Sequence, residues 1–197
     1  MMNICFVIPD RPIPGLGYYP ECITRKAEQD LLRLIDEHPW MNDLRRRVQH
    51  YGYRYDYTLR EVPTASYLGE VPSWLAGLAR TLHAQGFYPQ EPDQIIINEY
   101  LPGQGIAPHI DRTTCFGGTI AVLSLCAPIT MEFTCERTGE KWSQRLEPRS
   151  LAIMQGDARY KWRHGIRPRK SDLVDGVKVP RSRRISVTFR KVLPDRE

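Results

Sequence analysis

Cysteine is scarce in this 197-residue chain, and its residues are scattered. The five cysteines stand at positions 5, 22, 115, 126 and 135, and no two of them form a C-x-x-C pair. An odd number of widely spaced cysteines argues against a disulfide framework. The pattern predicts free thiols in a reducing compartment, which favours a cytoplasmic protein.

Long apolar segments, repeats and low-complexity segments are also missing. The chain contains no run of 18 apolar residues, and it does not open with a basic segment followed by an apolar one. These absences predict a chain without a membrane-spanning helix or a secretory signal. We therefore expect no membrane association, and the sequence points to no obligate protein partner.

The charge balance favours one class of partner. The net charge is +5 and the isoelectric point is about 9.0, which suits a polyanion such as nucleic acid, although many basic proteins bind none. With 41% hydrophobic and 26% charged residues, the composition is that of an ordinary globular protein.

The periodicity of apolar residues changes near residue 94. Before it, two helices are predicted: one is capped by Thr24 and stopped by Pro39, and the other covers roughly 72–86 with Ser73 as its N-cap. After it, turn signals separate short strands, and 165–182 reads as an exposed basic loop. Two helices followed by many strands predict an α+β fold dominated by a jelly roll. The strands are expected at 94–100, 119–126, 129–135, 142–147, 150–155, 159–164 and 183–192.

His109 and Asp111 carry the main chemical signal. They follow a Pro-Gly turn in the stretch Asn98-Glu-Tyr-Leu-Pro-Gly-Gln-Gly-Ile-Ala-Pro-His-Ile-Asp. Residues i and i+2 of an extended chain point to the same side, so this imidazole and carboxylate can bind one ion. Two histidines and one carboxylate on one face of an octahedron are the ligand set of non-haem Fe(II) oxygenases. Such a site needs a second histidine.

His164 is the candidate for that histidine. It ends the expected strand 159–164 and stands 53 residues after Asp111, about four or five short strands later. In a jelly roll, that spacing can return a strand to the side of an earlier one. A lone histidine at a strand end is more often structural, and only the pairing with His109 and Asp111 favours a metal ligand.

The last expected strand combines an apolar face with an arginine-bearing face. We expect the apolar face in a core between sheets, whereas the polar face either lines a cavity that holds an anion or is simply solvated. Two arginines six residues apart lie roughly 20 Å apart along a strand, so they would bracket a dicarboxylate rather than grip one carboxylate. The polar face carries Arg184, Ser186, Thr188 and Arg190, and the apolar face carries Ile185, Val187 and Phe189.

Residues 45–60 begin with three consecutive arginines, and tyrosines follow at every second position. Tyr51, Tyr53, Tyr55 and Tyr57 stand at period two, which predicts a strand or hairpin arm with one aromatic face. This arm either lays tyrosines on the core or forms a nucleic-acid lid, in which arginines bind phosphates and tyrosines stack on bases. The two interpretations are compatible. The arginines concerned are Arg45, Arg46 and Arg47.

Taken in order, these motifs resemble the AlkB family of Fe(II)- and 2-oxoglutarate-dependent dioxygenases. The similarity covers roughly residues 45–192 and is nearest to the AlkB-like domain of tRNA wobble-uridine modifying enzymes. It implies a double-stranded β-helix (jelly roll) with the N-terminal helices packed on the outside of one sheet. It also implies one domain over 1–197, with helices and a nucleotide-recognition lid in 1–92 and a catalytic core in 93–192. The matching motifs are Asn98-x-Tyr100, Pro-Gly-x-Gly, His109-x-Asp111, His164-Gly-Ile and Arg184-Ile-Ser-Val-Thr-Phe-Arg190.

The resemblance assigns roles to these residues. His109, Asp111 and His164 would bind Fe(II), with O₂ as oxidant. Arg184 would bind the distal carboxylate of 2-oxoglutarate, and Arg190 would lie near its metal-binding end. The cosubstrate would also meet Asn98, Tyr100 and Ser186, and the lid would consist of Tyr53, Tyr55, Tyr57 and the three arginines.

The implied activity is oxidative demethylation of alkylated bases in DNA or RNA. Thr113 departs from the family pattern, because AlkB itself has there an aspartate that helps to read the damaged base. Two alternatives therefore remain open. The first is hydroxylation of a tRNA base or of another substrate by the same chemistry, and the second is a non-catalytic nucleic-acid-binding module.

Overall fold

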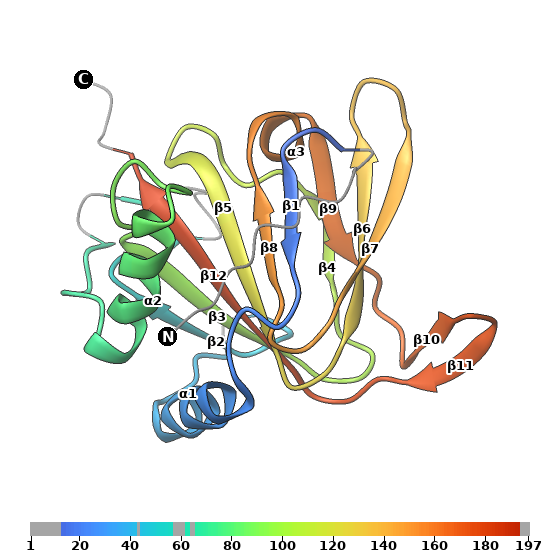
Figure 1. Ribbon diagram of the computed structural model, residues 1–197, viewed down its shortest axis with the longest axis horizontal. Coiled ribbons are helices and arrows are strands. Elements are labelled where there is room, and N and C mark those ends of the chain that lie inside the picture. The colour runs from blue at the N-terminus through green and yellow to red at the C-terminus, as the bar shows by residue number, and fades with distance from the viewer. Residues whose placement is uncertain (1–12, 43, 57–61, 64–65, 194–197) are drawn as a thin grey trace.

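A computed structural model describes residues 13–42, 44–56, 62–63 and 66–193. Two sheets dominate it, and every strand pairing within them is antiparallel (Figure 1). The larger sheet has the order β1-β8-β5-β12-β3-β2, and the smaller has the order β4-β9-β6-β7. The predicted α+β jelly roll is confirmed. The strands are β1 (Leu16–Tyr19), β2 (Val48–Tyr51), β3 (Gln94–Tyr100), β4 (Ile106–His109), β5 (Phe116–Leu125), β6 (Ile129–Cys135), β7 (Lys141–Leu146), β8 (Leu151–Met154), β9 (Trp162–Ile166), β10 (Ser171–Val174), β11 (Val177–Pro180) and β12 (Arg184–Val192).

Three helices accompany the sheets in the described part of the chain: α1 (Arg25–Glu37), α2 (Ser73–Ala84) and the short α3 (Gly156–Tyr160). Thr24 caps α1, because its side-chain oxygen accepts a hydrogen bond from the Ala27 amide at 3.2 Å. The prediction of Ser73 as a cap is wrong. Pro72 occupies the N-cap position in an extended conformation without a side-chain hydrogen bond, and Ser73 is the first helical residue. None of the described helices is long and apolar enough to cross a membrane.

The helices α1 and α2 pack on the outer face of the larger sheet, as predicted (Figure 1). Leu31, Ile35, Leu75 and Leu82 from these helices share one core with alternate residues of the central strands. A second core, which includes Val122, Met131 and Phe133, draws its residues from both sheets.

This arrangement corrects one expectation about β12. The apolar face of the strand does not lie between the sheets, because Ile185, Val187 and Phe189 belong to the core beneath the helices. The opposite face, which carries Arg184 and Arg190, is the one that points between the sheets and lines a cavity there. The helices cover the apolar face, so the space between the sheets can hold polar side chains.

Two other segments differ from the sequence prediction. The expected strand 159–164 begins only at Trp162, because residues Gly156–Tyr160 form α3. The expected loop 165–182 contains the hairpin β10–β11, which projects from the body in Figure 1. Its base is not exposed: Asp172 is buried and accepts hydrogen bonds from the also buried Arg181 at 2.8 Å.

The tyrosine arm is shorter than predicted. Strand β2 ends at Tyr51, and Gly52 follows with a φ of +73°, a conformation that favours glycine. A Cβ at this position would lie 1.8 Å from the carbonyl oxygen of Asp93. Tyr51 therefore packs with the helical core, whereas Tyr53 and Tyr55 pack with the core between the sheets. The single aromatic face was wrong, and Tyr57 lies outside the described residues.

Candidate active site

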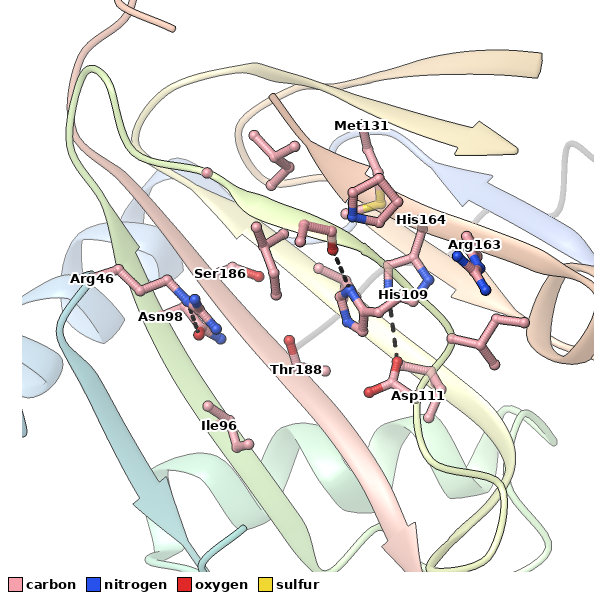
Figure 2. A pocket seen from close by; sticks show the side chains of 18 of the residues that line it. Arg46, Ile96, Asn98, His109, Asp111, Met131, Arg163, His164, Ser186 and Thr188 are labelled. Atoms are coloured by element: carbon pink, nitrogen blue, oxygen red, sulfur yellow. Dashed lines mark hydrogen bonds and ion pairs between the residues drawn. The ribbon is translucent and has the colours of Figure 1, made fainter. Parts of the chain in front are cut away.

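Three predicted metal ligands meet at one point of the fold. His109 ends β4 and lies opposite His164 of β9 in the strand register, with their ring centroids 4.4 Å apart. Asp111 follows β4 by two residues, and its carboxylate oxygen Oδ2 lies 3.5 Å from Nε2 of His164. One ligand atom from each of the three residues lies within 4.8 Å of the others. The residues converge in Figure 2.

Both histidines are prepared to bind a cation. Nδ1 of His109 lies 2.8 Å from the carbonyl oxygen of Ala107, to which it can donate, which leaves the lone pair of Nε2 for a metal. Burial, followed by the charge of His109, lowers the pKa of His164 to about 3. A neutral imidazole is the form that ligates metal ions.

Asp111 is held as a carboxylate. Burial alone would raise its pKa, but Arg190 and the two histidines lower the pKa well below the ordinary value. Nη2 of Arg190 lies 2.5 Å from Oδ1 of Asp111. The other oxygen, Oδ2, is buried and has no hydrogen-bond partner among the described residues. Buried polar atoms are rarely left unpaired, so an unpaired carboxylate oxygen beside two imidazoles fits a divalent cation.

Arg159, which the sequence analysis did not select, holds the backbone of this region. Its buried guanidinium donates to the Asp111 carbonyl at 2.7 Å, and it also donates to the carbonyls of Arg112, Phe116 and Gly117. Burial lowers the pKa of Arg159. Its partners are backbone carbonyls brought together by the fold, so no local sequence pattern could have revealed them.

Arg184 forms a second polar centre in the same cavity. The residue is 1% exposed, and among the described residues only Nη2 has a hydrogen-bond partner, the Ser124 hydroxyl at 2.9 Å. Nε and Nη1 are buried without a partner among the described residues. Burial lowers the pKa of Arg184 to about 10. A buried guanidinium with unused donors and no carboxylate beside it fits an anionic ligand.

The cavity that joins these centres has a volume of about 810 Å³. Asn98 and Tyr100 line it from β3, Ser186 and Thr188 line it from β12, and the metal ligands close the other side (Figure 2). Asn98 and Ser186 are directly opposite in the strand register. The predicted cosubstrate residues are therefore brought together around one cavity.

The predicted lid residues lie in different places, and only some of them line the cavity. Tyr55 lines the cavity and packs against Phe116, whereas Tyr53 pairs with Tyr67 and does not line it. Arg45 and Arg46 line the cavity.

Arg47 does not line the cavity. It pairs with Glu99 and lies over the Trp40 ring at 4.5 Å. The three arginine side chains therefore lie in different places, two at the cavity and one against Glu99.

A family comparison decides the chemistry that this geometry suggests. The model of the 2OG-Fe(II) oxygenase superfamily matches residues 33–190. The chain belongs to this superfamily. Its members use Fe(II), 2-oxoglutarate and O₂, and this oxygenase has both an unpaired carboxylate oxygen for the metal and unpaired guanidinium donors for the cosubstrate.

Similar proteins place the oxygenase beside the AlkB homologues. It is 40% identical to "Uncharacterized protein L905" of Acanthamoeba polyphaga mimivirus, over 92% of this chain and 87% of that protein. It is 37% identical to the "Alkylated DNA repair protein ALKBH8 homolog" of Arabidopsis thaliana, over 91% of this chain but 59% of that protein. It is also 37% identical to the Xenopus tropicalis "tRNA (carboxymethyluridine(34)-5-O)-methyltransferase alkbh8", of which it spans 32%.

Solved structures show the same fold. The structure of OsALKBH1 superposes with a TM-score of 0.68 at 15% identity, and it covers 90% of this chain and 98% of that chain. A Pseudomonas putida prolyl-4-hydroxylase superposes with a TM-score of 0.60 at 14% identity, over 93% and 94% of the two chains. Both similarities bear on the double-stranded β-helix fold alone.

Proposed function

We propose that this oxygenase oxidatively demethylates alkylated bases in DNA or RNA. The observation that carries the proposal is one cavity that holds the three candidate metal ligands and Arg184 and is also lined by Arg45, Arg112 and Arg163. Arginines around a cavity suit the phosphates beside a base. The net charge of +5 and the relatives named for alkylated DNA repair and for tRNA modification support the same class of substrate.

In this proposal the residues of the chain share the work. His109, Asp111 and His164 hold Fe(II), and Arg190 keeps the Asp111 carboxylate charged and oriented. Arg184 binds the distal carboxylate of 2-oxoglutarate through its unused donors. With O₂, the bound metal and cosubstrate supply the oxidation of a substrate C–H bond, while 2-oxoglutarate becomes succinate and CO₂.

The burial of two candidate metal ligands limits how a base can reach the site. The metal ligands His164 and Asp111 are 7% and 6% exposed, so a base stacked in a duplex cannot approach them. The target base must be flipped out or already unpaired. Tyr55 and Phe116, whose ring centroids are 5.7 Å apart, supply an aromatic wall for such a base.

Product analysis tests the proposal. The protein is mixed with Fe(II), 2-oxoglutarate and air, together with methylated single- and double-stranded DNA and RNA oligonucleotides. We expect one succinate and one formaldehyde for each base restored, and no product with Asp111→Ala. Asp30→Ala, which removes an exposed carboxylate on α1, should behave as wild type. If no oligonucleotide stimulates succinate formation, nucleic acid is not the substrate.

A second candidate is stable hydroxylation of a tRNA base. Thr113 stands two residues after Asp111, where AlkB itself has an aspartate that reads the damaged base. The printed name of the frog relative concerns a modified uridine of tRNA. Succinate formation without formaldehyde, accompanied by a base that has gained one oxygen atom, would favour this candidate.

A further inference from the structure

Arg46 is turned toward the cosubstrate region of the cavity. It belongs to the segment between α1 and β2, and its Nε donates to Oδ1 of Asn98, in the middle of β3, at 2.8 Å. In the view of Figure 2, Ser186 and Thr188 lie between this pair and the metal ligands His109 and Asp111. The side chain is therefore engaged inside the cavity, on the side opposite the metal.

The neighbours of Arg46 fix its backbone against β3. The carbonyl oxygen of Arg45 accepts a hydrogen bond from Gln104 Nε2 at 2.7 Å. The carbonyl oxygen of Arg47 accepts one from the Glu99 amide at 3.1 Å, and Nη2 of Arg47 donates to the Glu99 carboxylate at 2.8 Å. With both flanking residues tied to the β3 region, Arg46 is presented to Asn98 at little further entropic cost.

Two positively charged side chains near Tyr100 favour the binding of an anion there. The guanidinium carbons of Arg46 and Arg184 lie 5.7 and 5.4 Å from the centroid of the same Tyr100 ring. Neither guanidinium forms an ion pair with a carboxylate in the described part of the chain. Two cations against one ring repel each other, and a bound dianion would remove that repulsion.

The amide of Asn98 is oriented by the same contact. A guanidinium can only donate hydrogen bonds, so Asn98 must present its oxygen to Arg46. This leaves the two N–H bonds of Nδ2 for another acceptor. The carboxylate and keto oxygens of 2-oxoglutarate are such acceptors.

We propose that Arg46 is a positioning residue of the 2-oxoglutarate site. It holds Asn98 with its N–H groups available to the cosubstrate, and it adds a second positive charge to that of Arg184. This role replaces the expectation that Arg46 contacts a phosphate of the nucleic acid. It depends on the family's cosubstrate and not on the identity of the oxidised substrate.

Calorimetric titration of 2-oxoglutarate into the Mn(II)-loaded protein, without nucleic acid, tests this role. Arg46→Ala should weaken cosubstrate binding roughly tenfold or more, as expected for the loss of a hydrogen bond made by a charged group. Arg46→Lys, which keeps the charge but not the planar donor, should recover only part of the affinity. The Mn(II) affinity and the melting temperature show whether each variant is folded.

A double-mutant cycle tests whether Arg46 acts through Asn98. Arg46→Lys keeps the positive charge, so this variant combined with Asn98→Ala should lose little more affinity than the worse single variant if Arg46 acts through Asn98. Additive losses would overturn action through Asn98.

The matched control is Arg33→Ala, which removes an exposed arginine on α1 that pairs with Glu37 and lies outside the cavity lining. We expect its cosubstrate affinity to equal that of wild type. An affinity change below about twofold in both Arg46 variants, with a weaker salt dependence of nucleic-acid binding, would overturn the proposal and restore a phosphate contact. Because the titration contains no nucleic acid, its outcome is independent of the proposed demethylation.

Discussion

His109 and His164 face each other directly across strands β4 and β9, with ring centroids 4.4 Å apart. The backbone pairing of the smaller sheet therefore sets the distance between two candidate metal ligands that are far apart in sequence. The third candidate, Asp111, is held independently through Arg190 and Arg159. Strand pairing and two arginines thus determine the positions of all three side chains.

Arg184→Lys should raise the KM for 2-oxoglutarate strongly. Lysine keeps the charge but lacks the planar set of donors that binds a carboxylate with two hydrogen bonds. We expect a rise of roughly tenfold to a hundredfold, which steady-state succinate formation would measure. Lys191→Arg, a change on the same strand outside the cavity lining, is the control. An unchanged KM would place the cosubstrate carboxylate elsewhere.

Arg159→Met should destabilise the protein and weaken metal binding together. The substitution keeps much of the apolar stem but leaves four buried or partly buried carbonyl contacts unmade. Each lost partner of a buried group costs about 1–3 kcal/mol, and relaxation and water entry reduce the sum. We expect the free energy of unfolding, measured by urea denaturation, to fall by roughly 2–4 kcal/mol. A fully stable variant with wild-type Mn(II) affinity would contradict the role of Arg159 in holding Asp111.

Glu99→Gln should destabilise the protein at neutral pH and lose its effect in acid. Burial would raise the pKa of Glu99, but hydrogen bonds from Arg47 and Arg183 lower it below the ordinary value of 4.5. A carboxylate with a depressed pKa stabilises the fold above its unfolded-state pKa, and that stability disappears as the pH falls through the folded-state value. The free energy of unfolding of wild type should exceed that of the variant by roughly 1–3 kcal/mol at pH 7.

Urea denaturation of both proteins between pH 7 and pH 3 measures this difference. The difference in free energy of unfolding should begin to shrink near pH 4.5 and continue to shrink below it. A difference that stays constant over this range would mean that the charge of Glu99 does not stabilise the protein.

Nucleic-acid binding should depend on Arg45 but little on Arg47. Arg45 lines the cavity, whereas Arg47 is bound to Glu99. Arg45→Ala should reduce the slope of log affinity against log salt by roughly one. Arg47→Ala should leave that slope almost unchanged while lowering stability. Equal slopes for wild type and both variants would remove this segment from the nucleic-acid interface.

The sequence predicted the fold class because the periodicity of its strands is strong. The expected strand 129–135 is the observed β6, and 94–100 is the observed β3. Short α3 was missed because five residues do not establish a helical period. The apolar face of β12 was placed on the wrong side, since alternation identifies two faces of a strand but not which layer covers each.

The site was predicted only as far as local patterns reach. The spacing of His109 and Asp111 revealed a shared direction, but the register that brings His164 opposite His109 is a tertiary property. Arg159, which binds carbonyls, and Arg46, which binds Asn98, meet their partners only in the folded chain. An arginine run looks the same in sequence whether its side chains face solvent or other residues.

Titration of the protein with Mn(II), followed by calorimetry, is the most direct test of the central claim. We predict that wild type binds one Mn(II) ion for each chain. The Mn(II) affinity should fall roughly a hundredfold or more in His109→Ala, Asp111→Ala and His164→Ala. Loss of a group that only supports a metal ligand already lowers metal affinity about 10–100-fold, so loss of a ligand should cost at least as much. His83→Ala, which alters a histidine bound to the Tyr88 carbonyl, should bind as wild type. Wild-type Mn(II) affinity in the Asp111 and His164 variants would contradict the account.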